Sequence, residues 1–302
     1  MRLTAIAALF SFGCVVADVP IEGKPCPCPD GYACHDGTCV QGTPSGSGGA
    51  GGSSNTTSTT GTGPCRGLCG TDGCSPCPEV AVVDAGGFGI DATEVPREAY
   101  ALFLADAVDP ATQSSRCTWN TSFLPREDIT TFCEGPYDMS AGRLPITCVD
   151  WCDAAAYCTW AGKHLCGRIG GVATLAIDEL DDPAESEWYR ACSAGGTKLY
   201  PYSDTFDDNA CNTIGNASDV RGVGDQLTCE GGFPGVFDMV GNAEEWEDAC
   251  DIGQDPAGDN CQIRGGAFWG DQIEATCLSD PGRRPDRSTA SNDWSFRCCS
   301  EL

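Results

Sequence analysis

Histidine and basic side chains are scarce in this chain. Its 302 residues include two histidines, and 17 Lys and Arg stand against 44 Asp and Glu, which gives a formal net charge of −27. Such acidity argues against nucleic acid and anionic membrane surfaces as partners, and it favours solubility or cation binding. We therefore expect no nucleic-acid partner.

Common enzyme signatures are missing as well. The sequence has no Gly-x-Ser-x-Gly elbow, no phosphate-binding loop and no His-Glu-x-x-His helix. Paired carboxylates such as Asp181-Asp182 do not indicate acid–base catalysis in so acidic a chain, because such pairs arise by chance and a solvated surface explains them better.

Beyond its first residues the chain has no apolar run that could span a bilayer. Leu3 to Phe12 are apolar, too few for a membrane span but typical of a signal peptide. Small residues up to Ala17 offer a cleavage site, so we expect secretion. Cys14, after Gly13, offers the alternative of a lipidated bacterial lipoprotein, and only that lipid would bring the protein to a membrane.

Cysteine, in contrast, is abundant. The 23 cysteines comprise Cys14, four within 26–39, four within 65–77 and fourteen within 117–299. Each group after Cys14 is even, as expected if each module closes its own disulfides. With two histidines, zinc explains this density poorly, so we expect an oxidising compartment.

Composition divides the chain into five segments. We expect a signal peptide at 1–17, a Cys-rich knot at 18–40, a flexible Gly/Ser/Thr linker at 41–64, a second Cys-rich knot at 65–78 and a globular domain at 79–302. We interpret the knots and the linker as a stalk.

Helices are expected to be few in the globular domain. One helix follows Pro96, a second covers 151–161 behind Asp150 as N-cap, and a third covers 183–192. After residue 192 the chain is rich in Gly, Asp and Asn, which predicts short strands and long loops.

Oxygen-bearing side chains cluster on a glycine turn late in the chain. Asp238, Asn242 and Glu245 lie within eight residues of one another, around Gly241. Ca²⁺ accepts carboxylate, amide and backbone oxygens in irregular geometry, so this turn is a candidate calcium site. A polar loop without a metal is the alternative.

Several motifs follow one another in a fixed order through the globular domain. They are the residues 88–104, 145–163, 187–196 and 235–246, then Arg264-Gly-Gly and Ser295-Phe-Arg-Cys. In this order they resemble the formylglycine-generating enzyme (sulfatase-modifying factor) family. The resemblance covers about residues 79–302. It implies an irregular α+β domain of the C-type-lectin-like kind, with short strands, few helices and many disulfides.

Two calcium ions are implied by this resemblance. The ligands of the first are Asp238, the carbonyl oxygens of Gly241 and Ala243, and Glu245; those placed for the second are Asn212 and Thr213. Both ions would be structural, clamping loops that have few regular hydrogen bonds of their own.

Disulfides are implied in the same way. The resemblance pairs Cys158 with Cys298 and Cys192 with Cys277. Proximity in the sequence suggests three more pairs, Cys117–Cys133, Cys211–Cys229 and Cys250–Cys261, and leaves Cys148, Cys152, Cys166 and Cys299 unassigned.

Copper chemistry is where the sequence departs from the family. The family's oxidase binds Cu(I) through two cysteines, six and eleven residues after the arginine of Arg-Gly-Gly, because Cu(I) prefers soft thiolates. Counted from Arg264, these positions are Gly270 and Ala275, and Cys277 is the only cysteine within 262–297. We therefore expect calcium and no copper. Two distant histidines also cannot supply the three-histidine iron site of the family's ergothioneine-synthesising relatives.

The expected function is binding rather than catalysis. We expect a secreted or surface-tethered, calcium-stabilised binding or structural protein, with a protein or glycan ligand at the cell surface. The alternative is a divergent oxidase acting on protein cysteine through sulfurs such as those of Cys148 and Cys152. Candidate ligand-binding residues, near where a substrate peptide would lie in the family, are Trp269, Gln272, Arg283, Arg284, Arg287, Asn292 and Trp294. The alternative for the arginines within 283–287 is that they neutralise nearby acids.

Overall fold

The structure, a computed structural model, describes residues 32–35, 38–41, 65, 67–134, 137–171 and 173–302. The chain divides into two compact units, at 1–57 and 58–302. In the first unit, β1 (Tyr32–His35) pairs antiparallel with β2 (Thr38–Gln41). The predicted signal peptide, with Cys14, and the predicted linker lie outside the described residues.

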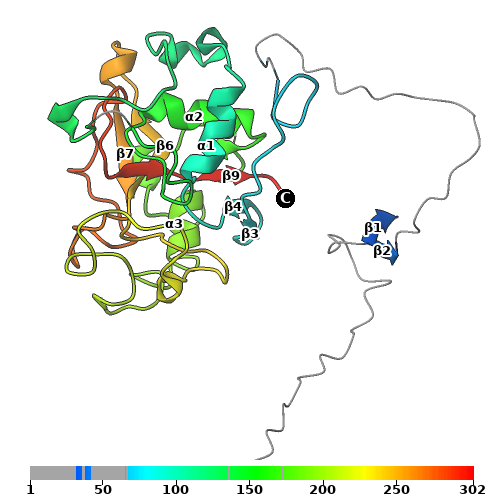
Figure 1. The fold of residues 1–302 in the computed structure, drawn as a ribbon. Helices are drawn as coiled ribbons and strands as arrows, with labels where there is room; N and C mark the ends of the chain where they lie inside the picture. Colours follow the sequence, from blue (N-terminus) through cyan, green and yellow to red (C-terminus); the bar gives the residue numbers. More distant parts are fainter. Residues whose placement is uncertain (1–31, 36–37, 42–64, 66, 135–136, 172) are drawn as a thin grey trace, which may run out of the picture. The chain divides into compact units, whose positions relative to one another are not determined.

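Two small sheets organise the second unit (Figure 1). One is antiparallel with the order β3-β4-β9-β5, and the other has β6 in its centre, antiparallel to β7 and parallel to β8. Their strands are β3 (Val82–Asp84), β4 (Gly89–Asp91), β5 (His164–Leu165), β6 (Glu244–Asp251), β7 (Asn260–Arg264), β8 (Trp294–Phe296) and β9 (Cys298–Ser300).

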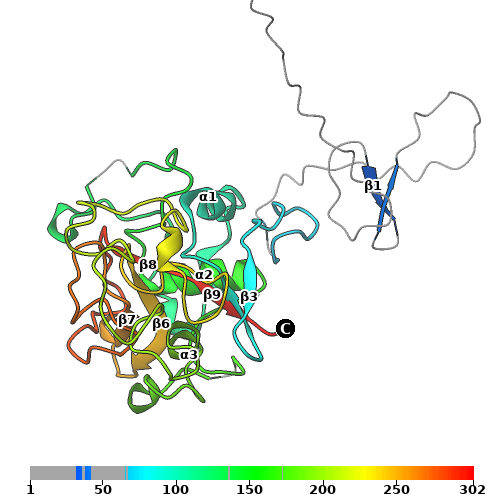
Figure 2. The ribbon, with the colours of Figure 1, turned by 90° about the horizontal axis from the view of Figure 1, so that it is seen from below.

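Helices are short, as the sequence predicts. In both ribbon views β9 lies between α1 and α3 (Figures 1 and 2). The α-helices are α1 (Arg97–Ala105), α2 (Trp151–Trp160) and α3 (Glu187–Cys192); the 3₁₀ turns are η1 (Pro110–Thr112), η2 (Ser115–Cys117), η3 (Ile129–Thr131), η4 (Ile177–Glu179), η5 (Leu227–Cys229) and η6 (Pro256–Gly258). Within the described ranges, none of these helices has the length and apolar character of a membrane span.

Capping residues set the helix boundaries. The Asp150 carboxylate accepts hydrogen bonds from the amides of Cys152 and Asp153, and Asp153 in turn accepts from the Asp150 amide, so α2 begins where the sequence predicts. The third helix is shorter than predicted. Ser186 is its N-cap, with Oγ 3.0 Å from the Tyr189 amide nitrogen, so α3 starts four residues later than the expected 183.

Aromatic side chains fill the space between α1 and α2. Tyr100 and Phe103 of α1 pack against Tyr157 and Trp160 of α2 with ring centroids 5.5–5.8 Å apart. The Phe296 ring of β8 also packs against this cluster, with its centroid 5.5 Å from that of Tyr157. The predicted helix faces are thus joined into one core.

The segment 65–78, which the sequence placed in the stalk, belongs to the domain. Cys65 and Cys69 are buried in the same core as α1 and α2. Their backbone amides donate to the carbonyl oxygens of Asp106 and Trp160, at 3.0 and 2.8 Å. The domain therefore begins before residue 79.

Disulfides close every cysteine between residues 65 and 302. The structure pairs Cys158 with Cys298 and Cys192 with Cys277, which are the two pairs the resemblance implies. The pair Cys117–Cys133 is wrong: Cys117 bonds Cys152 in the first turn of α2, and Cys133 bonds Cys148 just before that helix, which proximity in the sequence does not reveal. The remaining pairs are Cys65–Cys74, Cys69–Cys77, Cys117–Cys152, Cys133–Cys148, Cys166–Cys299, Cys211–Cys229 and Cys250–Cys261.

Candidate functional site

The segment that would carry copper in the family is a closed turn without sulfur. The Gly270 amide donates to the carbonyl oxygen of Ala267, and the Ala275 amide donates to that of Asp271. Ala275 is fully buried. Directly after it, Cys277 forms a disulfide with Cys192 of α3. The turn is therefore anchored at both ends, but it offers no thiolate.

The alternative copper pair is also closed. Cys148 bonds Cys133, and Cys152 bonds Cys117. Both members of the pair suggested for a divergent oxidase are therefore unavailable as Cu(I) ligands while these bonds persist.

Next to the turn, three of the predicted ligand-binding residues come together. We call Glu244, Trp269, Arg283, Asp293 and Trp294 the Trp269 cluster. Arg283 forms a two-point ion pair with Glu244, and its guanidinium lies 5.2 Å from the centroid of the Trp269 ring. The indole nitrogens of Trp294 and Trp269 donate to Glu244 and Asp293, at 3.1 and 2.6 Å.

Strand pairing explains why these residues meet. Glu244 begins β6 and Trp294 begins β8, and the two stand opposite each other in the parallel pair. The Arg283 carbonyl accepts from the Ile263 amide of β7, which holds Arg283 beside the same sheet. Trp269, Arg283 and Trp294 remain partly exposed, so a ligand can reach their side chains.

Burial and ion pairing act in opposite directions on the pKa values of Glu244 and Arg283 in the Trp269 cluster. Burial raises the pKa of Glu244 to about 7, although the hydrogen bonds and positive charge of Arg283 lower it. The same pairing raises the pKa of Arg283 against the effect of its own burial. The cluster therefore presents two indoles and a guanidinium, together with an acid that changes charge near neutrality.

The other predicted ligand-binding residues point to different places. Gln272 is exposed, and its carbonyl oxygen accepts from the Tyr200 hydroxyl. Arg284 pairs with Asp251 at 2.6 Å. Asn292 is half-buried.

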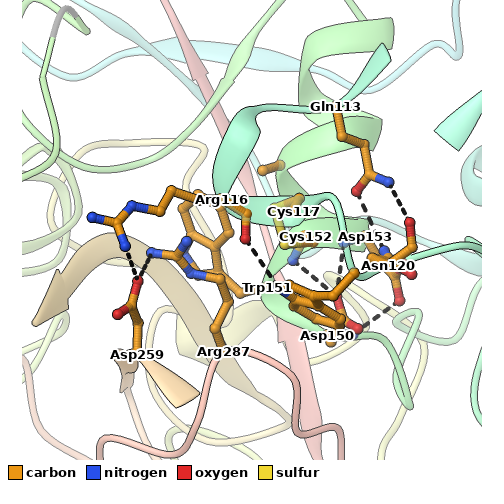
Figure 3. The surroundings of a disulfide bond; sticks show 12 residues. Gln113, Arg116, Cys117, Asn120, Asp150, Trp151, Cys152, Asp153, Asp259 and Arg287 are labelled. Carbon is orange, nitrogen blue, oxygen red and sulfur yellow. Dashed lines mark hydrogen bonds and ion pairs between the residues drawn. A yellow bond between two sulfur atoms is a disulfide. The ribbon is translucent and has the colours of Figure 1, made fainter. Parts of the chain in front are cut away.

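Arg287 is a buried structural cation instead of a ligand-binding residue. It is 2% exposed and lies 4.6 Å from the centroid of the Trp151 ring, at the N-terminus of α2. It shares Asp259 with Arg116, at 3.2 and 3.4 Å (Figure 3). The sequence expectation for this residue is therefore corrected, because an Arg this deep cannot be reached by a macromolecular ligand.

The candidate calcium turn has a backbone that glycine makes possible. Asp238, Gly241 and Asn242 have φ values of 56°, 74° and 59°, in the left-handed region. A Cβ on Gly241 would lie 2.5 Å from the carbonyl oxygen of Asn212, so no other residue fits there without a shift. The turn is thereby pressed against Asn212, which accepts from the Asn242 amide at 2.8 Å.

Three carboxylates meet one guanidinium beneath this turn. Glu245 and Arg297 form a fully buried ion pair at 2.6 Å, and the Trp188 indole nitrogen donates to Glu245 at 2.8 Å. Asp238 accepts from the Gly224 amide at 2.6 Å. Glu94 is 0% exposed, and the negative charges of Asp238 and Glu245 lie close enough to affect its pKa.

The electrostatics of this group favour an added cation. Burial, then the charges of Asp238 and Glu245, raise the pKa of Glu94 well above its ordinary value. Burial raises the pKa of Asp238 to about 6. With only Arg297 opposing three acids, the group is short of positive charge whenever all three are ionised.

Orphaned oxygens identify where such a cation would find ligands. Glu94 Oε2, Asn212 Oδ1 and Thr213 Oγ1 are buried without a hydrogen-bond partner. The Asn212 amide group donates to Asn242 Oδ1 at 3.0 Å, so the two predicted calcium sites adjoin. Carboxylate, amide and hydroxyl oxygens are the kinds of donor that Ca²⁺ takes. Glu94, Asp238 and Glu245 are not, however, among the groups of described side chains whose ligand atoms all lie within 4.8 Å of one another.

Sequence reasoning missed two residues of this group, Glu94 and Arg297. Both lie in motifs that carry the resemblance, Glu94 just before Pro96 and Arg297 in Ser-Phe-Arg-Cys. No local spacing links them to Asp238, because they are brought together by β4, β8 and β9. Only those motifs could have indicated them.

Comparison with known proteins agrees with this architecture. Residues 50–302 match the family described as "Sulfatase-modifying factor enzyme 1-like domain". Mouse inactive C-alpha-formylglycine-generating enzyme 2 is 30% identical over 177 residues, covering 52% of this chain and 49% of the mouse protein. Cattle formylglycine-generating enzyme is 27% identical over 183 residues, covering 52% and 44%. The chain thus spans about half the length of the curated relatives it matches.

Among solved structures, PvdO from Pseudomonas aeruginosa is similar with a TM-score of 0.46 and 22% identity, over 71% of this chain and 80% of that one. The family match confirms the predicted fold class, an irregular α+β domain of the formylglycine-generating-enzyme-like, C-type-lectin-like kind with short strands and many disulfides. The chain belongs to the family of sulfatase-modifying factor enzyme 1-like domains.

Proposed function

We propose that this chain is a secreted or surface-tethered, calcium-stabilised protein that binds a protein or glycan ligand and has no oxidase activity. One observation carries the proposal: the positions of the family's copper cysteines hold Gly270 and Ala275, and the neighbouring Cys277 is closed by a disulfide. The similarity to a mouse protein named as inactive supports the same conclusion.

Loss of the oxidase is tested by loading the purified full chain with Cu(I) and offering a peptide with a sulfatase cysteine motif. We expect no aldehyde by mass spectrometry, with an active formylglycine-generating enzyme as the positive control. Alkylation and peptide mapping of the denatured, unreduced protein should leave every cysteine from Cys65 onward unlabelled. Aldehyde formation would overturn the proposal.

Calcium would stabilise the turn at 238–245. Asp238, Glu245 and the carbonyl oxygens of Gly241 and Ala243 would hold the ion, and Asn212 and Thr213 would contribute beside them. The orphaned Glu94 Oε2 would add a further acceptor, since Glu94 Oε1 already accepts from the Asn242 side chain of this turn at 2.9 Å. A divalent cation there offsets the excess of buried negative charge.

Recognition is assigned to the Trp269 cluster. Tryptophan and arginine are the residues that most often anchor binding interfaces, and here an ion pair and two indole hydrogen bonds hold them in place. Pre-ordered side chains lose little conformational entropy when a ligand binds.

A glycan array and a random peptide library displayed on phage distinguish the two ligand classes. Trp269→Ala should lose the ligand that the unaltered protein retains, and Trp119→Ala, another half-buried tryptophan, should keep it. A ligand bound equally by both variants would show that recognition takes place elsewhere on the surface.

Export rests on the leader and on the cysteines. An apolar stretch at 3–12 precedes a chain whose domain has nine disulfides within 65–302. Disulfides persist in extracellular and periplasmic compartments. N-terminal sequencing of the natural protein should begin at Asp18 after simple secretion, and intact mass should show a lipid on Cys14 after anchoring.

A further inference from the structure

A hollow beside α2 plays no part in the function proposed above. Its volume is about 350 Å³, at the lower end of the roughly 300–1,000 Å³ typical of small-molecule sites. It opens between α2, the loop 108–117 and three residues before α1, namely Cys65, Gly67 and Leu68. We propose that this hollow binds a small, uncharged, largely apolar molecule with up to three rings.

The helix face supplies the shape of the pocket. Trp151 and Trp160 stand nine residues apart on α2, with Ala155 and Ala156 between them, and all four line the hollow. At about 100° of rotation per residue, Trp151 and Trp160 lie on opposite sides of the helix, with Ala155 and Ala156 between them on the side that lines the hollow, so two bulky indoles flank a stretch of small side chains. This arrangement makes a slot.

Opposite the helix, the wall is apolar too. Leu68 and Val108 line it, together with the disulfide between Cys117 and Cys152. None of the described residues lining the hollow carries a charge. The lining lacks charge although 20% of the chain's residues are charged. Burying a charged group against such a lining costs free energy, so phosphates, carboxylates and ammonium groups are excluded as the principal ligand chemistry.

Hydrogen bonds turn the polar edges of both indoles away. Trp160 Nε1 donates to the Asp106 carboxylate at 2.8 Å, and Trp151 Nε1 donates to the Glu247 carbonyl oxygen at 3.0 Å. The two rings therefore offer the ligand hydrocarbon surface. Polar groups, such as the exposed hydroxyls of Thr112 and Ser114, are found elsewhere in the lining.

Crosslinks keep the slot open. The Cys117–Cys152 disulfide ties η2 to the first turn of α2 (Figure 3). Asp106 binds Trp160 and also accepts from Ser75, so a single carboxylate holds the helix and the segment 65–78 together. Binding to a pre-formed apolar slot is favourable because the ligand displaces water from apolar surface. The protein needs little reorganisation, so little free energy is spent on it.

The test uses N-phenyl-1-naphthylamine, an uncharged dye that fluoresces in apolar surroundings, with the oxidised full chain. We expect a saturable increase in fluorescence at one site per chain. Its negatively charged analogue anilinonaphthalene sulfonate should bind at least about tenfold more weakly, a difference of about 1.4 kcal/mol. An absence of saturable binding, or equal binding of the two dyes, would overturn the inference.

Two variants locate the site. Ala156→Phe fills the slot and should weaken dye binding at least about tenfold, whereas Ala184→Phe makes the same change at an exposed position and should not. If Ala156→Phe fails to fold, Leu68→Asp replaces it, because Leu68 is 48% exposed and the change brings a charge to the slot. Unchanged binding by the folded slot variant would place the dye elsewhere. Trp269→Ala should bind the dye normally, which separates this site from the proposed recognition site.

Discussion

The turns at 238–245 and 270–277 are neighbours in the domain, but they differ in how far they match the family's sites. The turn at 238–245 keeps a buried ionic group, in which Glu94, Glu245 and Arg297 are fully enclosed. The turn at 270–277 keeps its disulfide and its backbone hydrogen bonds but holds Gly270 and Ala275 where the family has sulfur. A buried charge cannot be removed without its partners, whereas a reactive side chain can be lost while the backbone around it stays. Scaffold and reactivity are therefore separable in this fold.

The largest expected effect comes from breaking the charged half of this comparison. Arg297→Met should destabilise the domain by about 3–5 kcal/mol, because Glu94 and Glu245 are left buried without a cation. Urea unfolding followed by near-UV circular dichroism measures it. Arg284→Met is the matched control, since its pair with Asp251 is exposed and should contribute less than about 1 kcal/mol. Equal effects of the two variants would contradict the role given to burial.

The second-largest effect is expected from removing the Cys192–Cys277 disulfide, which anchors the turn at 270–277. Replacing Cys192 and Cys277 together by serine should cost about 2–4 kcal/mol, since the bond closes a separation of 85 residues in the unfolded chain. The pair Cys250 and Cys261, separated by 11 residues, is the control and should cost less. Thermal unfolding compares them. A larger loss from the short loop would show that native packing, not chain entropy, decides the effect.

Sequence patterns predicted those parts of the molecule in which the determining contacts are local. Asp150 caps α2 through residues two and three positions away, and Gly241 is needed by its own backbone angle, so both could be foreseen. Cys117 bonds Cys152 across 35 residues, which no local rule specifies. The resemblance supplied two long-range disulfides that spacing could not, Cys158–Cys298 and Cys192–Cys277, but it left Cys166 and Cys299 unassigned.

In the candidate sites the same limit applies. Glu94 reaches Asn242 across 148 residues, and its importance depends on burial, which the sequence does not state. Arg287 is grouped with Arg283 in the sequence analysis because the resemblance places both near the family's substrate peptide. The first packs on Trp151 and the second on Trp269, because their backbones follow different strands and loops.

The free energy of unfolding should also depend on pH through Asp238 of the turn at 238–245, with a smaller effect than those above. The pKa of Asp238 is raised by burial from 3.8 to about 6. Without calcium, the protonated carboxyl favours the folded state, so this contribution is present below pH 3.8 and is lost as the pH rises through about 6. Asp238→Asn should therefore gain stability over the unaltered, chelated protein between pH 4 and 7, by about 2–3 kcal/mol at most.

Calcium should reverse that sign. The ion binds ionised Asp238, so the calcium-loaded protein should gain stability above pH 6 while Asp238→Asn gains less. Unfolding with calcium or with a chelator, at each pH, measures both effects. Asp251→Asn, with a largely exposed side chain, is the control. If calcium leaves the stability of the unaltered protein unchanged, the metal assignment is wrong, whereas the Asp238 titration is judged from the chelated samples alone.

The smallest expected cost belongs to restoring sulfur. A Cβ on Gly270 would lie 3.2 Å from the Ala267 carbonyl oxygen, so the double variant Gly270→Cys, Ala275→Cys should lose only about 1 kcal/mol. After alkylation has verified two new thiols, it should compete with bicinchoninate for Cu(I), while Gly270→Cys alone and the unaltered protein should not. Cu(I) binding would mean that the backbone of the former copper site persists and only its sulfur was lost. Failure of a folded double variant to bind would mean that the turn itself has been rebuilt, and scaffold and reactivity would then have changed together.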